Sequence, residues 1–75
     1  MVFEKVSNIL ANQFDVEESE ITMNTDLSEE LSADSLDYID LINSLEDEFS
    51  IEFSDDDAEG IKTVGDIVRL IEELV

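Results

Sequence analysis

Residues 31–49 read LSADSLDYIDLINSLEDEF, and this stretch decides the fold because it joins a helix start to a helical apolar pattern. Asp34 is a residue type that caps helices, and an acid in the first turn, Asp37, favours the positive end of the helix dipole. We therefore predict a helix that begins at Asp34 and ends near Phe49. Its apolar residues recur at helical spacing, and they are Leu36, Tyr38, Ile39, Leu41, Ile42, Leu45 and Phe49.

The residues on the N-terminal side predict one further helix and a long loop. Residues 2–14 place apolar side chains on one helical face, namely Val2, Phe3, Val6, Ile9, Leu10 and Phe14. Residues 15–33 carry only scattered apolar side chains among polar ones, which is typical of a loop. We expect this loop to include a short turn near residues 28–31. Its apolar side chains are expected to dip into the core, and they are Val16, Ile21, Met23, Leu27 and Leu31.

The residues on the C-terminal side predict two more helices after a short extended segment at residues 51–53. Ser54 caps a short acidic helix that Gly60 stops, and Thr63 caps a last helix. The buried side of that helix is expected to hold Val64, Ile67, Val68, Ile71, Leu74 and Val75. The predicted fold is a single all-α domain over residues 1–75, a small four-helix bundle with three long helices and one short one.

The composition excludes several classes of function. The 75 residues carry a net charge of −19, with three Lys or Arg, no His and no Cys. Nucleic acid is a poor partner because phosphate binding needs basic side chains. No secretory leader or membrane-spanning stretch is evident, and we expect a cytoplasmic monomer. An enzyme is not expected, because there is no imidazole, thiol or glycine-rich phosphate loop, and no specific metal site is expected.

Ser35 stands at the start of the predicted central helix, beside Asp34. Without a histidine to activate it, this serine is better interpreted as a group that another enzyme modifies than as a nucleophile. A phosphodiester there would lie in the field of the helix N-terminus, and we expect the hydroxyl to be exposed. Asp34 could help the modifying enzyme to hold a divalent metal and the donor's phosphates. On residues 34–36 alone, simple helix capping is the favoured explanation of the same residues.

The wider pattern resembles the acyl carrier proteins, which bear phosphopantetheine. The matching segments are residues 31–36, 37–42 and 45–53, and the order and length of the helices also fit. The resemblance implies that Ser35 carries 4′-phosphopantetheine, whose thiol holds acyl groups as thioesters during fatty acid synthesis or related lipid or polyketide synthesis. It implies modification by a phosphopantetheinyl transferase. It also implies that an acyl chain can slide between the helices from the Ser35 end.

The resemblance also implies a partner surface on the central helix. Acyl transferases, ketosynthases and other acyl-processing enzymes would present basic patches to it. Each exposed ion pair contributes little, so binding is expected to be weak and quickly reversed. The residues expected to contact partners are Leu36, Asp37, Ile39, Asp40, Glu46, Asp47 and Glu48.

The sequence departs from the family pattern at several positions. Ser32 stands where glycine is common, and Phe53-Ser54 replaces a frequent Ile-Pro pair. Asn43 stands where partners often meet an apolar residue, and Tyr38 is bulkier than usual one turn from the serine. Asn43 and Tyr38 are compatible with a carrier dedicated to a special pathway, although a lone aromatic side chain more often simply covers apolar surface.

Two alternative functions remain open from the sequence. One is a calcium-binding loop of the EF-hand type, in which the first, third, fifth, sixth and twelfth positions would be Asp55, Asp57, Glu59, Gly60 and Asp66. Its fifth and twelfth positions depart from the usual residues, and Thr63 would be a loop residue rather than a cap. The other alternative is an acidic inhibitor or nucleic-acid mimic, which would need no particular serine.

Overall fold

The computed structural model describes residues 2–31 and 34–75, and for Ser35 the backbone alone. Within these residues the chain forms helices and no strand. The elements are α1 (Val2–Phe14), the 3-10 helix η1 (Glu18–Glu20), α2 (Ser35–Phe49), α3 (Asp55–Glu59) and α4 (Val64–Leu74). The predicted all-α fold is confirmed, and so are the four α-helices within about one residue at each end. The short helix η1 was not predicted.

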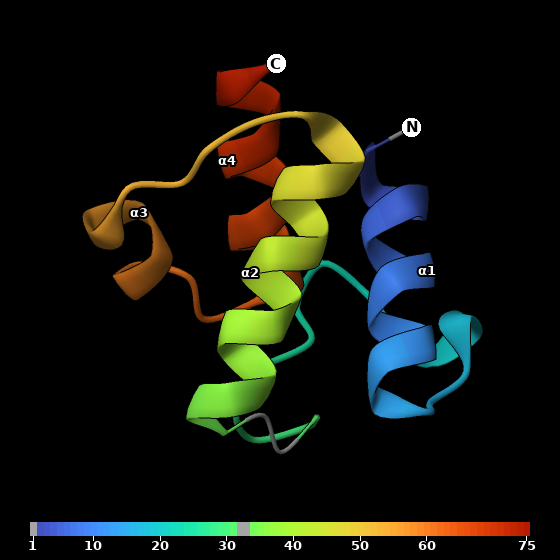
Figure 1. Ribbon diagram of the computed structural model, residues 1–75. Coiled ribbons are helices and arrows are strands. Elements are labelled where there is room, and N and C mark those ends of the chain that lie inside the picture. Colours follow the sequence, from blue (N-terminus) through green and yellow to red (C-terminus); the bar gives the residue numbers. More distant parts are fainter. Residues whose placement is uncertain (1, 32–33) are drawn as a thin grey trace.

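Helix α1 packs against both α2 and α4. Figure 1 shows α1 running opposite to α2 and α4, with α3 standing to the side of α2. The start of α2 lies at one end of the molecule, whereas the start of α1 and the end of α4 lie at the other end. No helix of the described part has the length and apolar character needed to cross a lipid bilayer.

The core forms where α1, α2 and α4 meet. Helix α2 contributes Leu41 and Leu45, which are one turn apart and fully buried. The other buried apolar side chains of the core are Val6, Leu10, Ile21, Leu27, Ile61, Val64, Ile67, Val68 and Ile71. Because the buried face of α2 is centred on Leu41 and Leu45, Ile39 lies outside it and is 57% exposed. The prediction that Leu74 and Val75 are buried is wrong, because these last residues lie beyond Ile71 and stay exposed.

The long loop between α1 and α2 is held against the start of α4. The backbone N–H of Val64 donates to the carbonyl of Thr25 at 3.0 Å, and that of Gly65 donates to the carbonyl of Met23 at 2.8 Å. These bonds satisfy N–H groups that a helix leaves free in its first turn. A Cβ on Gly65 would lie 2.9 Å from the Met23 carbonyl oxygen, so the close approach needs glycine.

The apolar side chains of this loop do not all enter the core. Ile21 and Leu27 are buried as predicted, and Val16 and Leu31 are half-buried. The Met23 side chain is 39% exposed, so the prediction that it dips into the core is wrong. Its backbone carbonyl, rather than its side chain, makes the contact with α4. The predicted turn is present at residues 27–30.

The caps read from the sequence are confirmed by hydrogen bonds. Asp34, Ser54 and Thr63 precede α2, α3 and α4, and each side chain accepts a bond from the backbone N–H three residues later. In each case an aspartate at that third position accepts a bond from the N–H of the capping residue in return. This reciprocal arrangement fixes where each helix begins.

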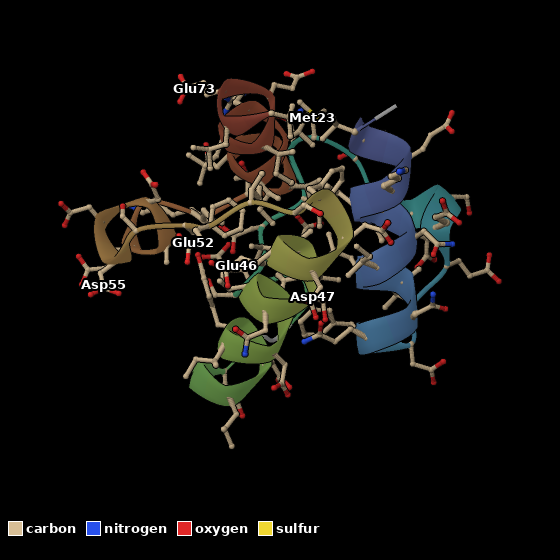
Figure 2. All side chains as sticks on the ribbon, turned by 45° about the horizontal axis from the view of Figure 1, so that its top comes forward. Met23, Glu46, Asp47, Glu52, Asp55 and Glu73 are labelled. Carbon is tan, nitrogen blue, oxygen red and sulfur yellow. The ribbon has the colours of Figure 1, made fainter. Side chains whose placement is uncertain are left out.

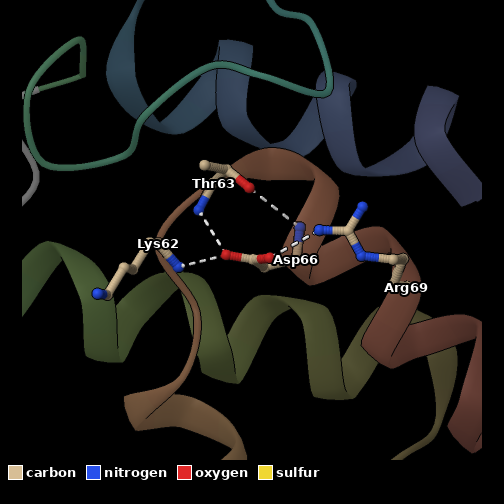
Figure 3. A network of polar contacts seen from close by, with 4 residues as sticks. All are labelled: Lys62, Thr63, Asp66 and Arg69. Atoms are coloured by element: carbon tan, nitrogen blue, oxygen red, sulfur yellow. Dashed lines mark hydrogen bonds and ion pairs between the residues drawn. The ribbon is translucent and has the colours of Figure 1, made fainter.

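Asp66 connects residues at the start of α4 through hydrogen bonds and an ion pair (Figure 3). One carboxylate oxygen accepts bonds from the backbone N–H groups of Lys62 and Thr63, at 3.0 and 3.1 Å. The other oxygen is 2.8 Å from a guanidinium nitrogen of Arg69. The bond from the Lys62 N–H is the largest cause that lowers the pKa of Asp66 below 3.8. The exposed ion pair adds little by itself.

We expect the stability of the domain to fall with pH below about 4 because of Asp66 and Asp26. The pKa of Asp26 is also lowered from 3.8, chiefly by the backbone N–H of Glu29 and then by the Ser28 hydroxyl. A lowered folded-state pKa means that the unfolded chain binds more protons in this range. Their stabilising contribution is therefore complete above 3.8 and is lost as pH falls through the lower folded values.

Urea unfolding between pH 5 and pH 2.5, followed by circular dichroism, measures this effect. The double variant Asp26→Asn/Asp66→Asn keeps side-chain acceptor oxygens but does not titrate. We expect its stability to depend less steeply on pH below about 4 than that of the wild type. Equal slopes for the two proteins would contradict the assignment to these two carboxylates.

Candidate functional site

The start of α2 is a tightly capped helix end. Ser35 is the first residue of the helix. The Asp34 carboxylate accepts a bond from the Asp37 N–H at 3.0 Å, and the Asp37 carboxylate accepts one from the Asp34 N–H at 3.3 Å. The Asp34 carbonyl accepts the Tyr38 N–H at 3.0 Å. The side chain of Ser35 lies outside the described residues, so the exposure of its hydroxyl stays a prediction.

The surroundings of Ser35 suit a covalently attached phosphate group. The residues on either side of it are exposed, with Leu36 72% accessible to solvent. The helix N-terminus presents backbone N–H groups and the positive end of the dipole, which favour a phosphodiester. Of the predicted site residues, Asp34 has a defined local role as the cap that holds this end in place.

Most of the acidic residues predicted to meet partners line a groove between α1 and α2. The groove has a volume of about 840 Å³. Gln13 of α1 connects the two helices in this groove, because its amide nitrogen donates to the Asp37 carbonyl at 2.7 Å. Figure 2 shows Asp47 on the side of α2 that faces α1. The lining residues are Ile9, Asn12, Gln13, Asp37, Asp40, Ser44, Asp47 and Glu48.

Two predicted partner residues, Leu36 and Ile39, lie apart from this groove and are exposed apolar side chains near the start of α2. Glu46 differs from the other acids, because it lies on the side of α2 toward α3 (Figure 2). It is half-buried, and its carboxylate accepts the Phe53 N–H at 2.8 Å. Glu46 therefore holds the segment that follows α2, through a contact between residues seven positions apart.

Tyr38 has a polar role that the sequence interpretation did not include. Its hydroxyl lies 2.9 Å from the carbonyl oxygen of Ala58 and 2.6 Å from that of Ile61. The phenol thus connects the first turn of α2 to the corner between α3 and α4. Burial, and next the negative charge of Asp66, raise the pKa of Tyr38 to about 12. The hydroxyl consequently stays protonated and remains a donor at neutral pH.

The residues of the EF-hand alternative do not form a calcium loop. Asp55, Asp57 and Glu59 lie in helix α3, and Thr63 is a helix cap. Asp66, which would supply the last ligand, instead accepts the backbone N–H groups of Lys62 and Thr63. Within residues 2–31 and 34–75, no three acidic side chains are gathered in a way that would hold a metal ion.

Comparisons with known proteins agree with this geometry. A family model described as a phosphopantetheine attachment site matches residues 4–71. The acyl carrier protein of Enterococcus faecalis, whose structure was studied for its high thermal stability, is 40% identical with a TM-score of 0.86. That match covers 99% of this chain and 94% of the other. A Mycobacterium tuberculosis protein provisionally assigned as an acyl carrier protein is 36% identical, covers 97% of each chain, and has a TM-score of 0.91.

The family match spans nearly all of the chain, and the matches to the two structures cover at least 97% of it. The cofactor of this family is phosphopantetheine, and its members interact with acyl-processing enzymes without catalysing a reaction themselves. From its capped helix, its fold and these matches, we conclude that the chain belongs to the phosphopantetheine-attachment family and is a non-catalytic carrier of the acyl carrier protein type.

Proposed function

We propose that Ser35 receives 4′-phosphopantetheine and that the chain carries acyl intermediates of fatty acid, related lipid or polyketide synthesis. The observation that supports this most is the position of Ser35 as the first residue of α2, between the exposed residues Asp34 and Leu36. The bound arm would supply a terminal thiol that holds an acyl group as a thioester. The chain has no cysteine, so it has no thiol of its own for this purpose.

The attachment step needs only a hydroxyl from this chain. The Ser35 oxygen would form the new bond to phosphorus while the phosphoric anhydride bond of coenzyme A breaks. Adenosine 3′,5′-bisphosphate leaves, and a base on the transferase takes the serine proton. Asp34 would support the reaction by holding the first turn of α2 in its capped form, and the N-terminus of α2 would stabilise the phosphodiester that results.

The proposed partner surface combines exposed apolar side chains with acidic ones. Leu36 and Ile39 would make apolar contacts near the arm, and the acids would meet basic patches on acyl transferases, ketosynthases and the phosphopantetheinyl transferase. These acids are Asp37, Asp40, Glu46, Asp47 and Glu48, of which Glu46 is already engaged by the Phe53 N–H. The net charge of −19 speeds encounter with basic surfaces and opposes self-association. We propose a cytoplasmic monomer.

Mass spectrometry of the wild-type protein tests the attachment site. After incubation with coenzyme A and a broad-specificity phosphopantetheinyl transferase, the intact mass should increase by one phosphopantetheine. Fragmentation of the modified peptide should then place the added mass on Ser35. A failure to react, or an added mass on a different hydroxyl, would refute the proposal.

A further inference from the structure

Helix α3 is a five-residue helix that α2 holds through two polar side chains. At one end, the Tyr38 hydroxyl reaches the carbonyl oxygens of Ala58 and Ile61. Eight residues further along α2, the Glu46 carboxylate accepts the Phe53 N–H just before α3. These two tethers are about 12 Å apart along the axis of α2. They fix the position of α3 relative to α2 at both ends.

A groove of about 290 Å³ lies between the two tethers. Its apolar lining comes mainly from Ile39, Ile42 and Phe53, with Ala58 on α3. Tyr38 and Glu46 line its two ends along α2. Tyr38 is three residues after Ser35, so the two positions lie on neighbouring turns of the same helix face. The Tyr38 end of the groove is therefore the end nearest the proposed attachment point.

We infer that Tyr38 is a specificity-determining residue that closes this groove at the Ser35 end and keeps the acyl group outside the helices. This inference rests on the proposed attachment at Ser35. An acyl chain that passed from Ser35 between α2 and α3 would have to displace the half-buried phenol from both carbonyls. The Ala58 carbonyl would keep its bond from the Ile61 N–H, but the Ile61 carbonyl would lose the Tyr38 donor, and leaving a partly buried carbonyl unpaired is unfavourable.

Closure of the groove by Tyr38 determines which acyl groups the carrier is expected to hold. A long apolar chain that stays in water keeps the unfavourable hydration that burial would remove. Short or polar acyl groups lose little by remaining outside. This carrier is therefore suited to short or polar acyl groups, which partner enzymes can reach without first drawing them out of the carrier.

The accessibility of the thioester can be measured without any synthase. The transferase is used to load Ser35 with acetyl- or octanoyl-phosphopantetheine from the corresponding coenzyme A thioester, and the intact mass verifies loading. Hydroxylamine then attacks the thioester carbonyl, which forms a hydroxamate and releases the thiol of the arm. Since the chain has no cysteine, a thiol reagent detects only this thiol. Free acetyl- and octanoyl-pantetheine correct for the intrinsic reactivity of each thioester.

On wild-type protein we expect the corrected octanoyl and acetyl rates to agree. In Tyr38→Ala the octanoyl rate should fall at least about threefold below the acetyl rate, because the opened groove shelters the chain part of the time. Slower octanoyl cleavage on the wild type, or equal rates on the variant, would overturn the inference. If Tyr38→Ala does not fold by circular dichroism, Tyr38→Phe replaces it, with an expected decrease of about twofold. A protein that cannot be loaded at all refutes the attachment site instead.

Discussion

Replacing Ser35 with alanine is expected to abolish the attachment of phosphopantetheine completely. The reaction requires a hydroxyl oxygen to bond to phosphorus, and alanine has none. The helix itself should persist, because the cap is supplied by Asp34 and Asp37 rather than by Ser35. Intact mass after incubation with coenzyme A and the transferase measures the result, and no modified protein should be detectable.

Ser19→Ala is the matched control for this experiment. Ser19 is an exposed serine in the short helix η1, away from the start of α2. This variant should be modified as completely as the wild type, and both variants should have the circular dichroism spectrum of the wild type. Modified protein in the Ser35→Ala sample would show that a different hydroxyl is the attachment site.

The second large effect, a decrease in the free energy of unfolding, is expected from Leu45→Ala in the core. Leu45 is fully buried on α2 and belongs to the core that α2 forms with α1 and α4. Truncating a buried leucine loses the free energy gained by moving its apolar atoms out of water, and it leaves a cavity. Together these lower the free energy of unfolding by about 2–5 kcal/mol. Small domains lie near the lower end of the usual range of about 5–15 kcal/mol. Leu45→Ala should therefore leave the domain only marginally folded at room temperature.

Leu36→Ala provides the same chemical change on the same helix at an exposed position. Leu36 is 72% exposed, so its truncation should change the free energy of unfolding by no more than about 0.5 kcal/mol. Urea unfolding followed by circular dichroism measures both variants, with the dependence on urea concentration expected to stay the same. Similar losses for the two leucines would mean that the buried face of α2 is not centred on Leu41 and Leu45.

The helix boundaries could be predicted because their causes are local. Asp34, Ser54 and Thr63 cap the three helices that follow them, and their side-chain bonds span only three residues. The exposure of Met23 could not be predicted in this way. It depends on the Met23 carbonyl bonding to Gly65, forty-two residues away in the sequence. Apolar character alone does not indicate which atoms of a loop residue make its contact.

In the candidate site, too, features with local causes could be predicted, whereas features that depend on distant contacts could not. The position of Ser35 follows from the motif and from the helix start, both of which are visible in residues 31–49. The sequence does not show that the acids of α2 lie on two different sides of the helix, because this depends on which helix packs against each side. Asp47 faces α1, whereas Glu46 binds the backbone before α3. The Tyr38 hydroxyl likewise finds its acceptors twenty or more residues away.

The placement of the chain ends has a practical consequence. The beginning of α1 and the end of α4 both lie at the end of the molecule opposite the start of α2 (Figure 1). A purification tag, a fluorophore or a solid support joined to either terminus would consequently point away from Ser35. Immobilised protein should still be loaded with phosphopantetheine. Binding assays on a sensor surface should leave the start of α2 free for enzymes arriving from solution.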